Sequence, residues 1–160
     1  MTEILHSPGF LGTNANFAAD MTLTLSLLVI TLFSIGFYLA VRGRYDIHKW
    51  VQTSGALMNV ILVLWLMLLP YRTFIIQDTG GPREAIFYRV TMLHAAVGFF
   101  AFFLGNFVVL RGHKLVPKFL RFNNYKLFMR SAYALYLTTT ILGLWLYYTW
   151  YVAIPEPPVF

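Results

Sequence analysis

The chain has 160 residues, of which 59% are hydrophobic and only 11% are charged. Its mean hydropathy of +0.67 is typical of a membrane protein, because a soluble domain of this size needs far more charge to cover its surface. The absence of cysteine excludes disulfide bonds, thiolate metal sites and covalently attached haem. The net charge of +6 requires no nucleic acid, because anionic lipid headgroups are sufficient partners.

Four apolar segments are long enough to cross the hydrocarbon core, which takes about 20 helical residues. They lie between a short N-terminal segment, 1–20, and a C-terminal tail, 153–160. Their ranges are 21–41, 48–69, 88–110 and 128–152. Only helices suit these spans, because each has to satisfy its own backbone polar groups. The sequence therefore predicts an all-α integral membrane protein built as a four-helix transmembrane bundle.

Basic residues predict how this bundle is oriented. Nine of the 12 Lys and Arg residues lie in or beside the loops after the first and third spans: Arg42, Arg44, Lys49, Arg111, Lys114, Lys118, Arg121, Lys126 and Arg130. By the positive-inside rule these loops face the cytoplasm, so both termini face the outer side of the membrane. The last six also alternate with aromatic residues, which favours a loop lying on the anionic inner headgroups.

Each span carries one stripe of small or polar residues at helical spacing, which predicts a bundle whose polar faces turn inward. The second span has His48, Gln52, Gly55 and Asn59. The third has His94, Gly98, Ala101 and Gly105, with Asn106 beside them. The fourth has Tyr133, Tyr136, Thr140, Gly143 and Tyr147. The first span has a weaker stripe of Thr24, Thr31, Ser34 and Tyr38.

The helical rise of about 1.5 Å per residue sorts these stripes by depth. Gln52, Asn106 and Tyr133 form an inner layer, and His48 lies at the inner surface. Asn59 and Thr140 fall near the middle of the membrane. His94 belongs to an outer layer, at the level of Met67 and Gly143. His48 and His94 are therefore about 20 Å apart along the membrane normal, too far to share one haem.

His94 is a candidate functional residue, because an ionisable side chain inside a span is costly unless it has a partner. One interpretation is a neutral imidazole that joins two helices by a hydrogen bond to Thr or Tyr. The others are a ligand of haem b, copper or a pigment, or a contact for protons or quinone. A pair of His94 and Met67 would suit copper.

Several motifs together resemble a known family. They are His48-Lys49-Trp50 at the opening of a span, MLHAAVGFF around His94, and YKLFMR leading into ALYLTTTILGLWLYY. This pattern resembles the four-helix bacterial membrane proteins of domain-of-unknown-function family 420, over about residues 45–150. The family includes CtaM-type maturation factors of haem-copper cytochrome oxidases. Two positions differ from the family pattern: Gln52 replaces a methionine, and Asn124 or Tyr125 replaces a histidine.

The resemblance implies an accessory or assembly protein of a respiratory system of the cytochrome oxidase type, in which His48 and His94 handle copper or haem. The two differences favour a relative recruited as a fixed subunit of a respiratory or photosynthetic complex. A third hypothesis is a small b-type cytochrome that exchanges electrons with quinone. An independent enzyme is disfavoured, because the chain has no paired carboxylates, nucleophile set or phosphate loop.

Overall fold

The computed structural model describes residues 5–68, 72, 86–121 and 123–153. Four long helices make up most of this part of the chain: α2 (Phe17–Val41), α3 (Tyr45–Leu62), α5 (Ile86–Gly112) and α6 (Tyr125–Tyr151). A π-helical turn, η1 (Val63–Met67), continues α3, and a short 3₁₀ turn, η3 (Lys118–Leu120), lies between α5 and α6. The expectation of an all-helical protein is confirmed for the described residues.

Three helical stretches are long and apolar enough to cross a membrane: Phe17–Val41, Tyr45–Met67 and Tyr88–Gly112. The fourth helix, α6, has 27 residues but is rich in Tyr, Thr and Trp, which lowers its hydropathy. Length and composition thus make this a candidate multi-pass membrane protein with three apolar spans. The place of α6 in such a bundle has to be argued from its packing.

The helices begin earlier than the apolar runs do, because polar residues cap them. The Asn16 side chain accepts a hydrogen bond from the Ala19 amide, so α2 begins at Phe17 and not at residue 21. The Asn124 side chain accepts one from the Leu127 amide, so α6 begins at Tyr125 and not at residue 128. Most of the connection between the second and third predicted spans, 69–71 and 73–85, and residues 154–160 of the predicted C-terminal tail lie outside the described residues.

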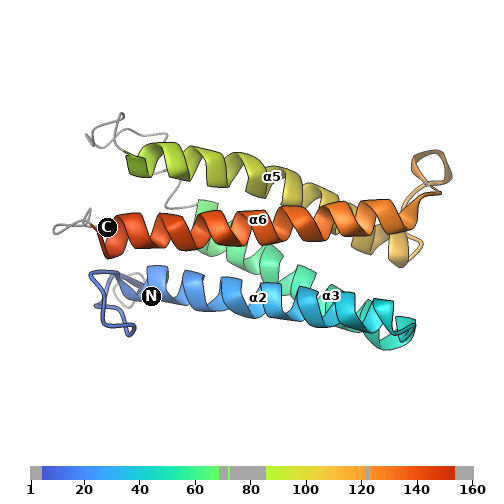
Figure 1. Cartoon of the computed structure of the whole chain (residues 1–160), viewed down its shortest axis with the longest axis horizontal. Coiled ribbons are helices and arrows are strands. Elements are labelled where there is room, and N and C mark those ends of the chain that lie inside the picture. The colour runs from blue at the N-terminus through green and yellow to red at the C-terminus, as the bar shows by residue number, and fades with distance from the viewer. Residues whose placement is uncertain (1–4, 69–71, 73–85, 122, 154–160) are drawn as a thin grey trace.

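The helices form two antiparallel pairs, α2 with α3 and α5 with α6 (Figure 1). α6 also packs against α2, and α3 packs against α5, which closes the bundle. The start of α2 and the end of α6 lie at the same end of the bundle, and the short α2–α3 connection and the longer α5–α6 connection lie at the other (Figure 1). We call these two ends the terminal end and the loop end.

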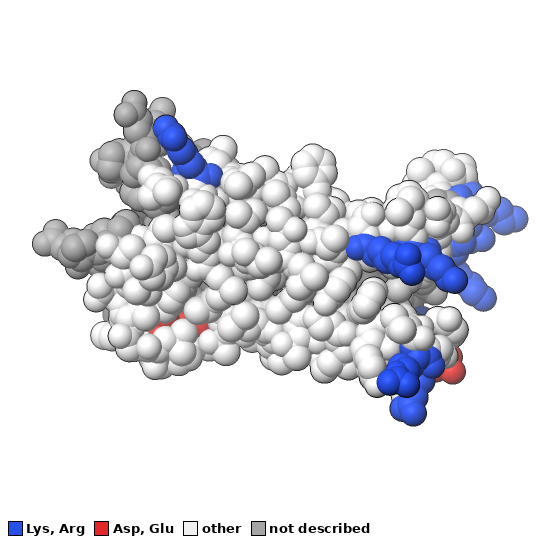
Figure 2. Space-filling model, in the orientation of Figure 1, with Lys and Arg blue, Asp and Glu red and all other residues white. Residues whose placement is uncertain are grey.

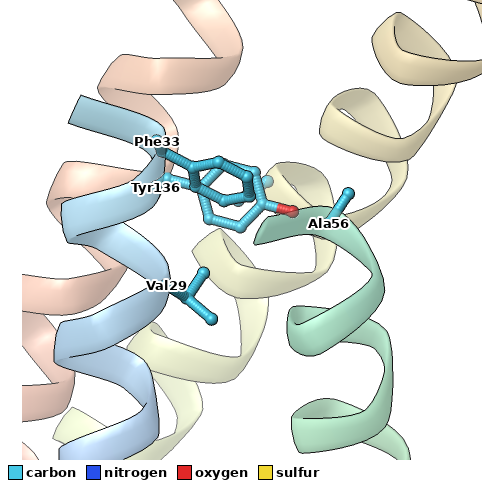
Figure 3. Packing of buried hydrophobic residues seen from close by; sticks show 5 residues of the cluster. Val29, Phe33, Ala56 and Tyr136 are labelled. Atoms are coloured by element: carbon cyan, nitrogen blue, oxygen red, sulfur yellow. The ribbon is translucent and has the colours of Figure 1, made fainter. Parts of the chain in front are cut away.

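The core between the helices is small and mixed. Val29 and Phe33 from α2, Ala56 from α3, Ala101 from α5 and Tyr136 from α6 form one buried cluster, four of which are labelled in Figure 3. Most other large apolar side chains on the helices are exposed. In water such a surface would aggregate, whereas in a lipid bilayer it is the surface that meets the acyl chains.

Candidate functional site

Most of the polar contacts between helices in the described part of the bundle involve α6. The Ser34 and Tyr133 hydroxyls are 2.9 Å apart, which joins α2 to α6. The Asn59 side-chain amide donates to the Tyr136 hydroxyl at 3.1 Å, which joins α3 to α6. His94 bonds to the Thr139 carbonyl, which joins α5 to α6. Tyr133 and Tyr136, two of the residues that lower the hydropathy of α6, therefore lie on its inward face, whereas Tyr148 is exposed.

The inner layer lies where α2 and α3 cross near the loop end. The Gln52 side-chain amide donates to the Phe33 carbonyl at 3.2 Å. A Cβ added at Gly36 would lie only 2.5 Å from the Gln52 Nε2 atom, so glycine is what lets Gln52 approach α2. The Phe37 ring stacks on Tyr133, with 4.9 Å between centroids. Gln52 and Tyr133 are thus both engaged between helices.

His48 is buried, with 9% of its surface exposed. Its Nδ1 atom lies 2.7 Å from the Gly36 carbonyl oxygen of α2. A carbonyl oxygen only accepts, so Nδ1 carries the proton and donates it. The lone pair of a neutral His48 therefore lies on Nε2. His113, in contrast, bonds through its Nε2 atom to the Thr53 hydroxyl at 2.8 Å.

The middle layer is centred on Tyr136. Its ring lies 4.5 Å from that of Phe33 between centroids, and Figure 3 shows the two rings side by side in the cluster. Gly105 of α5 faces the same ring, because an added Cβ would come within 2.5 Å of Tyr136 Cε2. The hydrogen bond from Asn59 is buried, and between helices in a membrane such a bond contributes about 0.6–2 kcal/mol.

His94 lies against α6 in the half of the bundle nearer the terminal end. Its Nδ1 atom is 3.1 Å from the Thr139 carbonyl oxygen, so Nδ1 donates and Nε2 holds the lone pair of the neutral ring. A Cβ at Gly143 would lie 3.1 Å from Cε1 of His94 and 3.5 Å from Nδ1. The Nδ1–Cε1 edge of the imidazole therefore rests on α6. Among the described residues Nε2 of His94 has no hydrogen-bond partner.

The two histidines lie at different levels. His48 bonds to Gly36, next to the Phe37 ring that stacks on Tyr133, whereas His94 lies beside Gly143. Tyr133 and Gly143 are ten residues apart on α6, which is about 15 Å along the helix axis. One metal or one haem iron between His48 and His94 is incompatible with this separation.

Other candidate residues from the sequence do not join a shared polar site between the helices. The Asn106 side-chain amide donates to the Phe102 carbonyl of its own helix at 2.8 Å. The Thr140 hydroxyl likewise donates to the Tyr136 carbonyl of α6. Met67 is the last residue of η1 and is partly buried, whereas the His94 ring contacts Thr139 and Gly143 of α6. Within the described ranges no three His, Cys, Asp or Glu side chains cluster to hold a metal ion.

The sequence stripes did not include Asp20, which is 0% exposed at the terminal end. Its Oδ2 atom accepts from the amides of Phe10 and Leu11 at 2.6 and 2.7 Å. Its Oδ1 atom accepts from the Tyr147 hydroxyl, which also lies 2.7 Å from the Thr13 hydroxyl. The carboxylate thus joins α2, α6 and the segment before α2. An acidic residue beside an apolar run gives the same sequence signal when it is solvated, so sequence alone could not single it out.

The predicted basic loops do gather at the loop end, and the belt between the two ends is nearly free of charge in this view (Figure 2). Eight of the nine basic residues at this end are exposed: Arg42, Arg44, Lys49, Lys114, Lys118, Arg121, Lys126 and Arg130. Arg111 is partly buried where α5 ends. An uncharged belt with cations at one rim is the distribution expected of a bundle that crosses a membrane.

Comparison with protein-family models, with curated proteins and with solved structures finds no match to this chain. Any functional conclusion has to be argued from the arrangement of its own residues.

Proposed function

We propose that the chain is a four-span protein of a bacterial inner membrane that accompanies a respiratory redox complex of the cytochrome oxidase type. In this proposal it is an accessory or assembly protein without catalysis of its own. His94 offers its Nε2 atom as one ligand to a haem iron or a copper ion. The resemblance to domain-of-unknown-function family 420 at His48, His94 and Arg130 supports the same proposal.

The fourth span of this proposal is α6. It is as long as α5 and lies between α5 and α2, and its polar side chains have partners on other helices. A helix packed in this way spans the membrane together with α2, α3 and α5. Four crossings put the terminal end on one side and the loop end on the other, and the cations of the loop end favour the cytoplasmic side.

The observation that carries the role of His94 is its hydrogen bond to the Thr139 carbonyl. Donation from Nδ1 to a backbone carbonyl fixes the ring orientation and the tautomer, which is the usual outer-shell support of a metal-binding histidine. One imidazole fits one ligand position, so the remaining ligands have to come from the group itself or from another chain. A bound haem or copper ion would supply electron transfer, while this chain supplies the oriented imidazole.

A second candidate function is a permanent subunit of a larger membrane complex. Phe99, Phe100 and Phe103 form an exposed aromatic ridge on α5, with 58%, 64% and 56% of their surfaces exposed. The Phe99 ring lies 5.7 Å from Phe100 and 4.6 Å from Phe103. Such a ridge can pack against a helix of a partner protein as well as against lipid. The choice between an accessory protein and a permanent subunit therefore depends on which complex the chain accompanies.

The test is gentle purification from the native membrane, followed by a visible spectrum, metal analysis and identification of copurifying chains. We expect subunits of a redox complex together with haem or copper, and we expect the haem or copper to be lost in His94→Ala. His113→Ala is the matched control, because that ring bonds through Nε2 to Thr53 and should leave the spectrum unchanged. A colourless, metal-free protein without redox partners contradicts the proposal.

Assembly and subunit roles differ in what happens when the gene is deleted. An assembly protein leaves the oxidase polypeptides in the membrane without their haem or copper. A permanent subunit leaves a smaller complex that still holds both. Metal and haem analysis of the purified oxidase from deletion membranes distinguishes these outcomes.

A further inference from the structure

Two arginines flank a tight turn at the loop end. α2 ends at Val41, and the Arg44 amide donates back to the Leu39 carbonyl while the Gly43 amide donates to that of Ala40. Gly43 has a φ of 73°, a left-handed conformation that glycine adopts without strain. This turn brings Arg42 and Arg44 to the same side of the chain.

The two arginines line a surface hollow of about 380 Å³, together with Tyr38 and Leu39. The Arg42 guanidinium lies over the Tyr38 ring, 5.2 Å from its centroid. Stacking on the ring holds this guanidinium near the hollow. Asp46 follows two residues after Arg44 but does not line the hollow, so the lining charge is that of two cations.

The hollow is at the rim where the apolar belt meets the basic loop end. Arg44 precedes α3, and Leu39 is part of the last turn of the apolar span Phe17–Val41. A ligand there would meet the guanidinium groups of Arg42 and Arg44 and an apolar wall formed by Tyr38 and Leu39. Paired guanidinium groups suit a phosphate group, because their planar forks donate two parallel hydrogen bonds to its oxygens. Acyl chains suit the wall.

We propose that this hollow binds the phosphodiester headgroup of an anionic phospholipid of the inner leaflet. The proposal rests on the proposed membrane crossing but not on His94, so a cofactor-free protein leaves it intact. The shared chemistry of the ligand is a phosphate group, and its two sources are a lipid and soluble phosphate. The apolar wall and the position at the rim favour the lipid.

The test uses the full chain in nanodiscs of phosphatidylcholine that contain a minority of phosphatidylglycerol. Native mass spectrometry counts the lipid that each chain retains, and titration with fluorescent phosphatidylglycerol gives its Kd. We expect the double variant Arg42→Gln with Arg44→Gln to weaken this Kd by about tenfold, because charged hydrogen bonds to the phosphate are lost. The matched control is Lys114→Gln with Lys118→Gln, which removes the same charge from the same end.

We expect the control to weaken binding by less than about threefold, since it lowers only the general attraction of the basic end. Equal weakening in both double variants would show a diffuse electrostatic effect and overturn the site. So would equal retention of phosphatidylcholine and phosphatidylglycerol by the native chain. Arginine-dependent binding of inorganic phosphate in pure phosphatidylcholine nanodiscs, without retained phosphatidylglycerol, would overturn the lipid assignment. Size-exclusion chromatography and helical circular dichroism verify that both variants fold.

Discussion

Tyr147, one turn from the end of α6, donates its hydroxyl to the carboxylate of Asp20 at the start of α2, 127 residues earlier in the chain. The same carboxylate accepts the amides of Phe10 and Leu11. The segment before α2 is therefore fastened to the terminal end of the bundle by one buried acid. Ala15 of this segment packs on Trp150 and Tyr151, which adds an apolar contact beside the polar one.

Replacing the buried Asp20 by alanine should destabilise the protein more than replacing the exposed Asp46. The change removes the acceptor of the partly buried Phe10 and Leu11 amides and of the Tyr147 hydroxyl, and each hydrogen bond to a charged group contributes about 1.5–3 kcal/mol. Asp46→Ala is the matched control, because Asp46 is also in the first turn of a helix but is exposed, and its effect should stay within about 0.5 kcal/mol. Reversible unfolding in mixed micelles, followed by circular dichroism, measures both.

The Asp20 contact also predicts how the preceding segment responds to protease. In Asp20→Ala, chymotrypsin should cleave at Phe10 and Leu11 faster than in the native chain, because their amides are no longer held. Tyr147→Phe keeps the hydrogen bonds from the Phe10 and Leu11 amides to Asp20. Its rate of cleavage should therefore lie between those of the native chain and Asp20→Ala. Cleavage at the native rate in Asp20→Ala would show that the apolar contact of Ala15 suffices to hold the segment.

Gly105 should be intolerant of any side chain. An added Cβ would come within 2.5 Å of Tyr136 Cε2, and the Tyr136 ring is held between Phe33 and the Asn59 hydrogen bond. We expect Gly105→Ala to cost about 2 kcal/mol by overpacking. Gly98→Ala is its control on the same stripe, two positions away, where the Cβ would meet only a methyl group of Thr139 at 3.3 Å. Equal unfolding free energies in the two variants would contradict the packing.

The sequence predicts much of this bundle because hydrophobic length and helical spacing are local properties. The helices lie where the apolar runs are, and the α5 stripe of His94, Gly98, Ala101 and Gly105 does lie against α6 or in the core. The ends of the helices are predicted less accurately, since polar caps such as Asn16 lengthen a helix beyond its apolar run. Hydropathy alone does not identify α6 as a member of the bundle, because polar groups on that helix form hydrogen bonds with its neighbours.

Partners across the bundle could not be predicted in the same way. Asn106 and Thr140 have the spacing of interior residues, yet each donates to its own helix, which a short polar side chain does as readily as bonding to a neighbour. Asp20 bonds to Tyr147, which is 127 positions away, and to Phe10 and Leu11 in the segment before α2. Spacing along one helix contains no information about either choice.

The proposed topology predicts which residues an impermeant thiol reagent reaches. The natural chain has no cysteine, so single substitutions report without a background. His6 and Lys118 are both exposed, at the terminal and loop ends respectively. We expect His6→Cys to react in intact spheroplasts and Lys118→Cys to react only after permeabilisation, as the positive-inside rule requires. The reverse pattern would show that the bundle has the opposite orientation in the membrane. Labelling of both cysteine variants in intact spheroplasts would rule out the proposed crossing.

The tautomer of His94 predicts a signal that needs no bound cofactor. With Nδ1 donating to the Thr139 carbonyl, Nε2 of the neutral ring is unprotonated, and ¹⁵N spectra of histidine-labelled protein at neutral pH should show this, with His94→Gln identifying the resonance. Gly143→Ala should shift this resonance, because the new Cβ lies 3.1 Å from Cε1 of the ring. Resonances of His48, about 15 Å away along the bundle, should stay in place. A protonated Nε2 in the native chain would remove the free lone pair on which the proposed ligand role of His94 depends.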